Sequence, residues 1–136
     1  MRTMKSFFIL GCSIILLNFN SQAQSTTTPE IALNYFNSGL HFLTLGDSLK
    51  AYQELEQAYS NSYKEDKISY YYLMLSLHLD KPFSEQKSLE WINQTHHVIY
   101  QNRLRYFLGG FYFKKQEAIK ALQTYSLIPI EDLNNN

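Results

Sequence analysis

From residue 30 onward, large apolar residues recur at the three- and four-residue spacing of one face of a helix, with polar residues between them. Within this pattern a small residue returns at Gly39, Ser76 and Gly109, at nearly equal intervals along the chain. A period of roughly 34 residues is typical of stacked helix pairs. The sequence has no strand-like alternation bounded by hairpin turns, so the pattern predicts an all-α chain.

The residues around each small position repeat as well. Small side chains are expected where the two helices of a pair touch, and large apolar side chains where neighbouring pairs pack. The structural positions predicted in this way are Gly39, Phe42, Ala51 and Ala58 in the first segment, Ser76 and Ser88 in the second, and Gly109, Tyr112 and Ala121 in the third. The sequence therefore predicts three helix pairs within residues 30–130, with repeat frames of about 32–65, 69–101 and 102–135.

This arrangement resembles the tetratricopeptide-repeat (TPR) family over about residues 30–135. The first and third segments match the family pattern well. The second has Ser76 and Ser88 where the family has smaller residues, and Leu133 stands where Pro is usual. The resemblance implies an α-solenoid in which three antiparallel helix pairs stack into a right-handed superhelix. It also implies a scaffold that displays a surface and carries no chemistry of its own.

Local signals predict where the helices begin and end. Thr28-Pro29-Glu30 has a capping hydroxyl, a first-turn proline and an acid near the positive end of a helix. Leu45-Gly46-Asp47 predicts one helix end and the start of the next, because glycine suits a left-handed closing residue and Asp47 can cap. The segment 80–84 predicts another turn, in which Ser84 is expected to cap the following helix.

The N-terminus has the pattern of a secretory signal peptide. Arg2 and Lys5 form a basic start, and the apolar stretch 7–17 follows. Small residues at the two positions read by a signal peptidase predict cleavage between Ala23 and Gln24. We therefore expect a signal peptide over 1–23 and export to the periplasm or cell envelope.

Two alternatives to cleavage between Ala23 and Gln24 exist. Cys12 lies in a sequence that looks like a bacterial lipoprotein signal, but few apolar residues precede it and the apolar run continues after it. An uncleaved anchor is the other alternative, although the apolar stretch is shorter than the roughly 20 residues that span a membrane. We expect residues 24–29 to form a short lead-in and the mature chain to contain no membrane span.

Composition narrows the partners of the expected mature chain. Cys12 is the only cysteine, so a chain that begins at Gln24 contains no disulfide, thiol nucleophile or cysteine metal ligand. Without Arg2 and Lys5, ten basic residues face twelve acidic ones, a net charge of −2. This balance argues against binding to nucleic acid or to an anionic membrane surface.

Candidate chemistry is sparse. His96 and His97 are adjacent, and neighbouring helical residues point in different directions, so the pair does not predict a metal site. Phosphate loops, nucleophile elbows and zinc-protease motifs are absent from the sequence. We expect neither a cofactor nor an enzyme; a hydrolase is an alternative without positive residue evidence. The basic residues Arg103, Arg105, Lys114 and Lys115 are either a solvated face or a clamp for an acidic peptide end.

The TPR resemblance implies that the first helix of each pair lines a concave groove. The groove residues that it implies here are Phe36, Leu40, Tyr70, Leu77, Arg103, Tyr106 and Phe113. Large aromatic side chains dominate many binding interfaces, so we expect an apolar peptide or helix as the partner. The competing interpretation is that these residues are ordinary core.

We therefore expect a non-enzymatic protein-interaction scaffold in the cell envelope. A second hypothesis follows from the last segment, where 129–136 resembles the lead-in to another repeat without a polar capping helix. On that hypothesis the chain is the N-terminal part of a longer TPR scaffold or of a TPR-containing membrane signalling receptor.

Overall fold

The computed structural model describes residues 28–62 and 65–133, and over these residues the regular structure is entirely α-helical. The helices are α1 (Thr28–Thr44), α2 (Ser48–Ser62), α3 (Asp66–His78), α4 (Ser84–Gln94), α5 (Val98–Lys114), α6 (Ala118–Ser126) and α7 (Ile130–Leu133). The all-α prediction is therefore confirmed for this part of the chain. The expected signal peptide, its cleavage site at Ala23 and Gln24, Cys12 and most of the lead-in lie outside the described residues.

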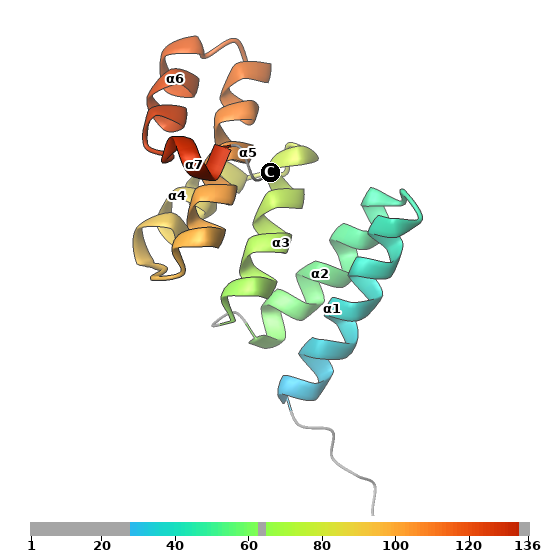
Figure 1. The fold of residues 1–136 in the computed structure, drawn as a ribbon. Helices are drawn as coiled ribbons and strands as arrows, with labels where there is room; N and C mark the ends of the chain where they lie inside the picture. Colours follow the sequence, from blue (N-terminus) through green and yellow to red (C-terminus); the bar gives the residue numbers. More distant parts are fainter. Residues whose placement is uncertain (1–27, 63–64, 134–136) are drawn as a thin grey trace, which may run out of the picture.

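Each helix from α1 to α6 packs against its neighbour in the chain, and α3 also packs against α5. In Figure 1, α1 and α2 lie side by side at one end, α5 and α6 lie at the other, and α3 runs between them. Short turns join the helices of each pair, and buried apolar side chains fill the space between them. Helix α3 thereby forms the centre of the molecule and contacts both α2 and α5.

Glycines bring the helices of the outer pairs close together. A Cβ added to Gly39 would lie 2.8 Å from Cγ of Leu55 on α2, and one added to Gly109 would lie 2.7 Å from the ring of Tyr125 on α6. Leu55 and Tyr125 follow their glycines at the same spacing in the sequence. The two contacts occupy equivalent places, because the helix pairs of the first and third segments align from α1 and α5 onward without a gap.

The other predicted structural positions are mostly interior. In the middle pair, Ser76 is buried and its hydroxyl donates to the carbonyl of Tyr72 at 2.7 Å, so the polar side chain is satisfied within its own helix. The remaining buried positions of this set are Ala51, Ala58, Ser88, Tyr112 and Ala121. Phe42 is half-buried and packs against the core.

The helix ends follow the local signals at the first turn and depart from them at the second. Gly46 has φ of 74°, and Asp47 Oδ1 accepts a hydrogen bond from the backbone N–H of Lys50 at 3.1 Å, which caps α2. The prediction that Ser84 caps α4 is wrong. Ser84 is the first residue of the helix and is buried. The capping position before it is occupied by Phe83, which has left-handed backbone with φ of 61° and a ring without an atom that could cap the helix.

Several apolar side chains on and between the last two helices are largely exposed to solvent. They are Ile119 and Leu122 on α6, Leu127 after it, and Ile130 on α7. Asn102 on α5 donates to Asp132 Oδ2 at 2.7 Å, which holds α7 against α5. The segment expected to be an uncapped tail therefore contains a short helix, α7, that is tied to α5 through a polar contact.

Candidate functional site

A row of aromatic side chains links the first helices of the three pairs. Phe36 on α1 meets the edge of Tyr71 on α3, and the neighbouring Tyr70 stacks on Tyr100 of α5 at 5.1 Å between centroids. His97 then stacks on Tyr100 at 4.3 Å. Such ring contacts add to the free energy of apolar burial, so the row helps to fix the spacing of α1, α3 and α5.

Three residues expected to line an open groove belong to the interior instead. Phe36, Tyr70 and Leu77 are 3%, 6% and 3% exposed, so little of each side chain is open to solvent, and of the three only Leu77 borders one of the hollows described below. Burial raises the pKa of Tyr70 above that of a free tyrosine. The groove interpretation is wrong for Phe36 and Tyr70, because ring contacts with Tyr71 and Tyr100 cover the surface that these two residues were expected to present.

The other predicted groove residues reach the surface to different extents. Leu40 and Arg103 are half-buried, whereas Tyr106 is 43% exposed and Phe113 is 72% exposed. Tyr106, Gly110 and Phe113 lie at successive four- and three-residue steps on α5, so they share one face of that helix. Gly110 has no side chain, so no side chain from this position fills the space between the two aromatic residues.

A hollow of about 230 Å³ opens beside this face. It lies between the end of α3, the second half of α5 and α6, and its lining residues are Leu77, His78, Tyr106, Phe107, Gly110, Phe111, Lys114 and Tyr125. The rings of Tyr106 and Tyr125 approach to 5.8 Å between centroids at one side. Burial raises the pKa of Tyr125, and its protonated hydroxyl is a hydrogen-bond donor among the residues that line the hollow.

The four basic residues noted in the sequence do not act as one cluster. Lys115 pairs with Asp80 at 3.0 Å, and Arg105 donates to Gln101 and Asn102 on its own helix. Burial lowers the pKa of Arg105 from its ordinary value. Lys114 is exposed at the rim of the hollow and Arg103 is half-buried, so the arrangement does not provide a four-residue clamp for an acidic peptide end.

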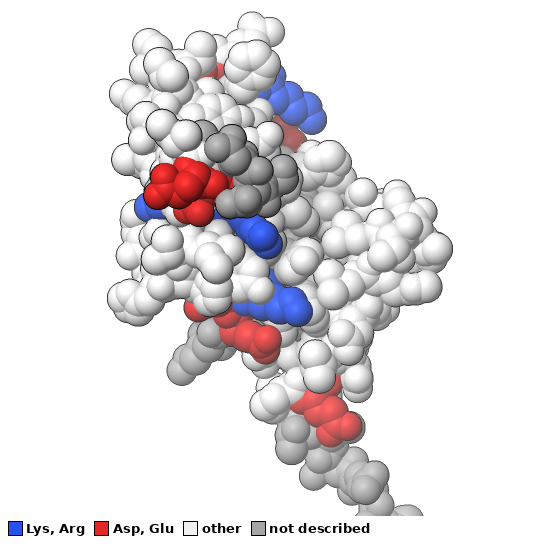
Figure 2. All heavy atoms as spheres, in the orientation of Figure 1, with Lys and Arg blue, Asp and Glu red and all other residues white. Residues whose placement is uncertain are grey.

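Charge is scattered on the surface. On the face drawn in Figure 2 most residues are uncharged, and the basic and acidic side chains form small separate patches. The helices that the structure describes include none long and apolar enough to cross a membrane. Among the described side chains, no group of three or more His, Cys, Asp and Glu residues could hold a metal ion.

A second and larger pocket, of about 550 Å³, lies on the other side of the end of α5. The turn between α3 and α4, the outer face of α4 and the end of α5 form its walls. Sequence reasoning missed it. The signal that points to it is the segment 79–83, which is longer than the turns of the first and third pairs and ends in an aromatic residue.

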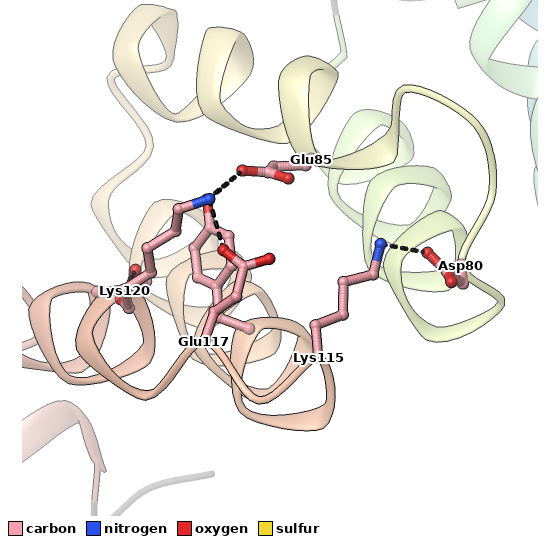
Figure 3. A network of polar contacts seen from close by, with 7 residues as sticks. Asp80, Glu85, Lys115, Glu117 and Lys120 are labelled. Atoms are coloured by element: carbon pink, nitrogen blue, oxygen red, sulfur yellow. Dashed lines mark hydrogen bonds and ion pairs between the residues drawn. The ribbon is translucent and has the colours of Figure 1, made fainter.

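Polar contacts between the second and third pairs border this pocket (Figure 3). Glu85 on α4 accepts a hydrogen bond from the hydroxyl of Tyr112 on α5 at 2.9 Å and faces Lys120 of α6 at 3.6 Å. Lys120 also pairs with Glu117, a hydrogen bond that raises the pKa of the lysine. The desolvated tyrosine and its bond to Glu85 join α4 to α5 more firmly than the exposed ion pairs do.

Comparison with known proteins identifies no relative. The chain matches no protein-family model, no curated protein and no solved structure. Function must therefore be argued from the two hollows and the residues around them.

Proposed function

We propose that this chain is a non-enzymatic protein-interaction scaffold of the TPR type, which holds an apolar segment of a partner against the exposed face of α5. The observation that carries this proposal is the stripe Tyr106, Gly110 and Phe113 beside the hollow of about 230 Å³. Two exposed aromatic residues on one rigid helix supply large contact area at little cost in side-chain entropy. The hollow is below the usual range for small-molecule sites and suits one or two apolar side chains of a peptide.

Three correspondences between the outer pairs support the TPR-type interpretation and a solenoid of helix pairs. Helices α1 and α5 each contain 17 residues. Gly39 and Gly109 contact the second helix of their own pair at equivalent places. Gly46 and Gln116, which align in the same way, both have left-handed backbone at the end of the first helix. A repeated unit that packs in the same way twice is what a solenoid requires.

Export to the periplasm or cell envelope is part of the proposal, and its support comes from the N-terminal sequence. Expression of the full chain in a bacterial host, followed by mass spectrometry of the envelope fraction, tests it. We expect the N-terminus at Gln24. Acylated Cys12 at the N-terminus would indicate a lipoprotein, and an intact Met1 would contradict processed export.

Panning of a peptide library on the purified chain tests the binding face. We expect apolar or amphipathic peptides whose affinity falls when Tyr106 or Phe113 is replaced by alanine, by about 1–3 kcal/mol each, or about five- to 150-fold in Kd. Leu45→Ala is the matched control, because Leu45 is an exposed apolar residue in the turn between α1 and α2. Selected peptides that bind both α5 variants as well as the parent would contradict the proposed face.

A further inference from the structure

The connection between α3 and α4 departs from the pattern of the outer pairs. Helix α3 contains 13 residues, against 17 in α1 and in α5. The closing turn itself is shared with the outer pairs: Asp80 has left-handed backbone with φ of 51°, and the N–H of Lys81 donates to the carbonyl of Ser76 at 2.9 Å. Five residues, 79–83, connect α3 to α4, where three residues suffice in each outer pair. The early end of α3 leaves space beside the end of α5.

Two residues of this connection have a backbone conformation that glycine normally adopts. Phe83 has φ of 61°, and Asp80 has φ of 51°. Left-handed backbone is strained for any residue with a Cβ, and most of all for a bulky side chain such as phenylalanine. Phe83 is also 72% exposed, so burial of its ring does not offset the strain. Strained residues of this kind concentrate at functional sites.

The lining of the pocket of about 550 Å³ beside Phe83 includes four apolar residues, Pro82, Phe83, Leu89 and Phe111. Phe111 is 6% exposed and forms its inner wall from α5, while Leu89 on α4 and Pro82 in the connection are open to it. The volume falls within the usual range for ligand sites. The pocket can therefore take a large apolar side chain between Phe83, Leu89 and Phe111.

The charges around the pocket are partly neutralised. Asp80 pairs with Lys115 at 3.0 Å, and Glu85 faces Lys120 at 3.6 Å (Figure 3). Lys81 directs its ammonium to the ring of Tyr52, 4.6 Å from its centroid. These contacts use the basic groups that lie closest to the pocket.

Glu90 remains. Its carboxylate lines the same pocket and accepts a hydrogen bond from the side chain of Gln86 at 2.9 Å. Among the ion pairs of the described residues, none involves Glu90. The pocket thus presents the apolar residues Phe83 and Leu89, and the ring of Phe111 under the Lys115 ammonium, beside the carboxylate of Glu90.

We infer that this pocket is a second peptide-binding site, specific for a segment in which a large apolar residue adjoins a lysine or arginine. The apolar side chain occupies the space between Phe83, Leu89 and Phe111, and the cation pairs with Glu90. The site is separate from the face around Tyr106, because Phe111 and the end of α5 stand between the two hollows. Charge complementarity selects the basic segment, since a carboxylate on the ligand would face Glu90 and Glu85.

Backbone amide chemical shifts of the isotope-labelled full chain, titrated with capped dipeptides, test the inference. The probes are N-acetyl-Phe-Arg-amide and N-acetyl-Phe-Glu-amide, which share the aromatic residue and carry opposite charges. We expect Phe-Arg to shift amides of 83–90 and of Phe111 at millimolar concentration, and Phe-Glu to bind more weakly. Glu90→Gln should weaken Phe-Arg binding about two- to five-fold, as for an exposed ion pair, and should remove most of the discrimination.

Phe83→Gly separates a binding role from a structural one. The change removes the aromatic rim and also relieves the left-handed strain, so the variant should be at least as stable as the parent while binding Phe-Arg about five-fold or more weakly. Tyr106→Ala should leave Phe-Arg binding unchanged, which distinguishes this site from the proposed face of α5. Equal binding of both dipeptides, shifts centred on Tyr106 and Gly110, or no shifts at all would each overturn the inference.

Discussion

The α-carbon of Gly109 lies against the ring of Tyr125, so closely that an added Cβ would be 2.7 Å from two carbons of that ring. Contacts of this length do not occur between carbon atoms that are not bonded, so the ring or the whole of α6 must move to admit even one methyl group. We expect Gly109→Ala to lower the free energy of unfolding by about 1–3 kcal/mol. Urea denaturation followed by circular dichroism measures this loss.

The neighbouring glycine provides the control. A Cβ on Gly110 would meet only the hydroxyl of Tyr125, at 3.6 Å, which is an ordinary contact. Alanine is the better helix former, so Gly110→Ala should leave stability unchanged or raise it by up to about 1 kcal/mol. Similar losses in the free energy of unfolding for both variants would show that the contact with Tyr125 is not the reason why Gly109→Ala is destabilising.

The two left-handed helix ends at Gly46 and Gln116 give a second prediction. Both close the first helix of an outer pair, with φ of 74° and 63°, but only one of them is glycine. Left-handed backbone costs a residue with a Cβ about 1–2 kcal/mol. Gln116→Gly should therefore raise the free energy of unfolding by about 1 kcal/mol, and Gly46→Ala should lower it by about 1–2 kcal/mol. Thermal unfolding of both variants checks the signs, and a loss at Gln116→Gly would contradict this account.

Helices α1 to α6 and the places where small residues lie could be predicted from the sequence, whereas α7 could not. The geometry of a helix determines which positions along one segment share a face. The apolar periodicity and the places of Gly39 and Gly109 can therefore be read from the sequence alone. Gly39 and Gly109 both contact the second helix of their pair. Equivalence between the outer pairs could be predicted for the same reason.

The exposure of the candidate site was harder to predict. Tyr70 and Phe113 were expected on one surface, yet Tyr70 is covered by Tyr100 from the next pair and Phe113 is open. Which aromatic residue is covered depends on how each helix is rotated against its neighbours, and spacing within one helix does not determine that rotation. The large pocket was missed because it lies beside the early end of α3 and the five-residue connection that follows, and helical periodicity does not predict where a helix without a glycine stop ends.

Phe36 and Phe113 should respond differently to truncation. Phe36 is buried against Tyr71, so Phe36→Ala should lower the free energy of unfolding by about 3–5 kcal/mol. Phe113 is exposed, so Phe113→Ala should change stability by no more than about 0.5 kcal/mol. Urea denaturation of the two variants measures both values. Strong destabilisation by Phe113→Ala would place that residue in the core and remove it from the proposed binding face.

Alkaline conditions should destabilise the protein through its buried and half-buried tyrosines. Desolvation raises the pKa of five tyrosines above the usual value of 10.0. They are Tyr52, Tyr59, Tyr70, Tyr112 and Tyr125. The unfolded chain loses these protons near pH 10, whereas the folded chain retains them. The folded state then binds more protons, so stability is full below about pH 10 and falls as the pH rises above it. Urea midpoints measured between about pH 8 and about pH 11 should decrease accordingly.

The variant Tyr112→Phe isolates the contribution of one of these tyrosines to the pH dependence of stability. Desolvation raises the pKa of Tyr112 first, and its hydrogen bond to Glu85 raises it further. At neutral pH the variant should lose about 1–2 kcal/mol, because the bond to a charged acceptor is removed and the partly buried Glu85 keeps Lys120 as its partner. Above about pH 10 the parent must hold a proton that its unfolded state releases, so the stability gap between parent and variant should narrow. Tyr106→Phe is the control for the loss at neutral pH, since Tyr106 is 43% exposed and removal of its hydroxyl should change stability by no more than about 0.5 kcal/mol. A gap between parent and Tyr112→Phe that stays constant across this range would show that Tyr112 does not retain its proton in the folded chain.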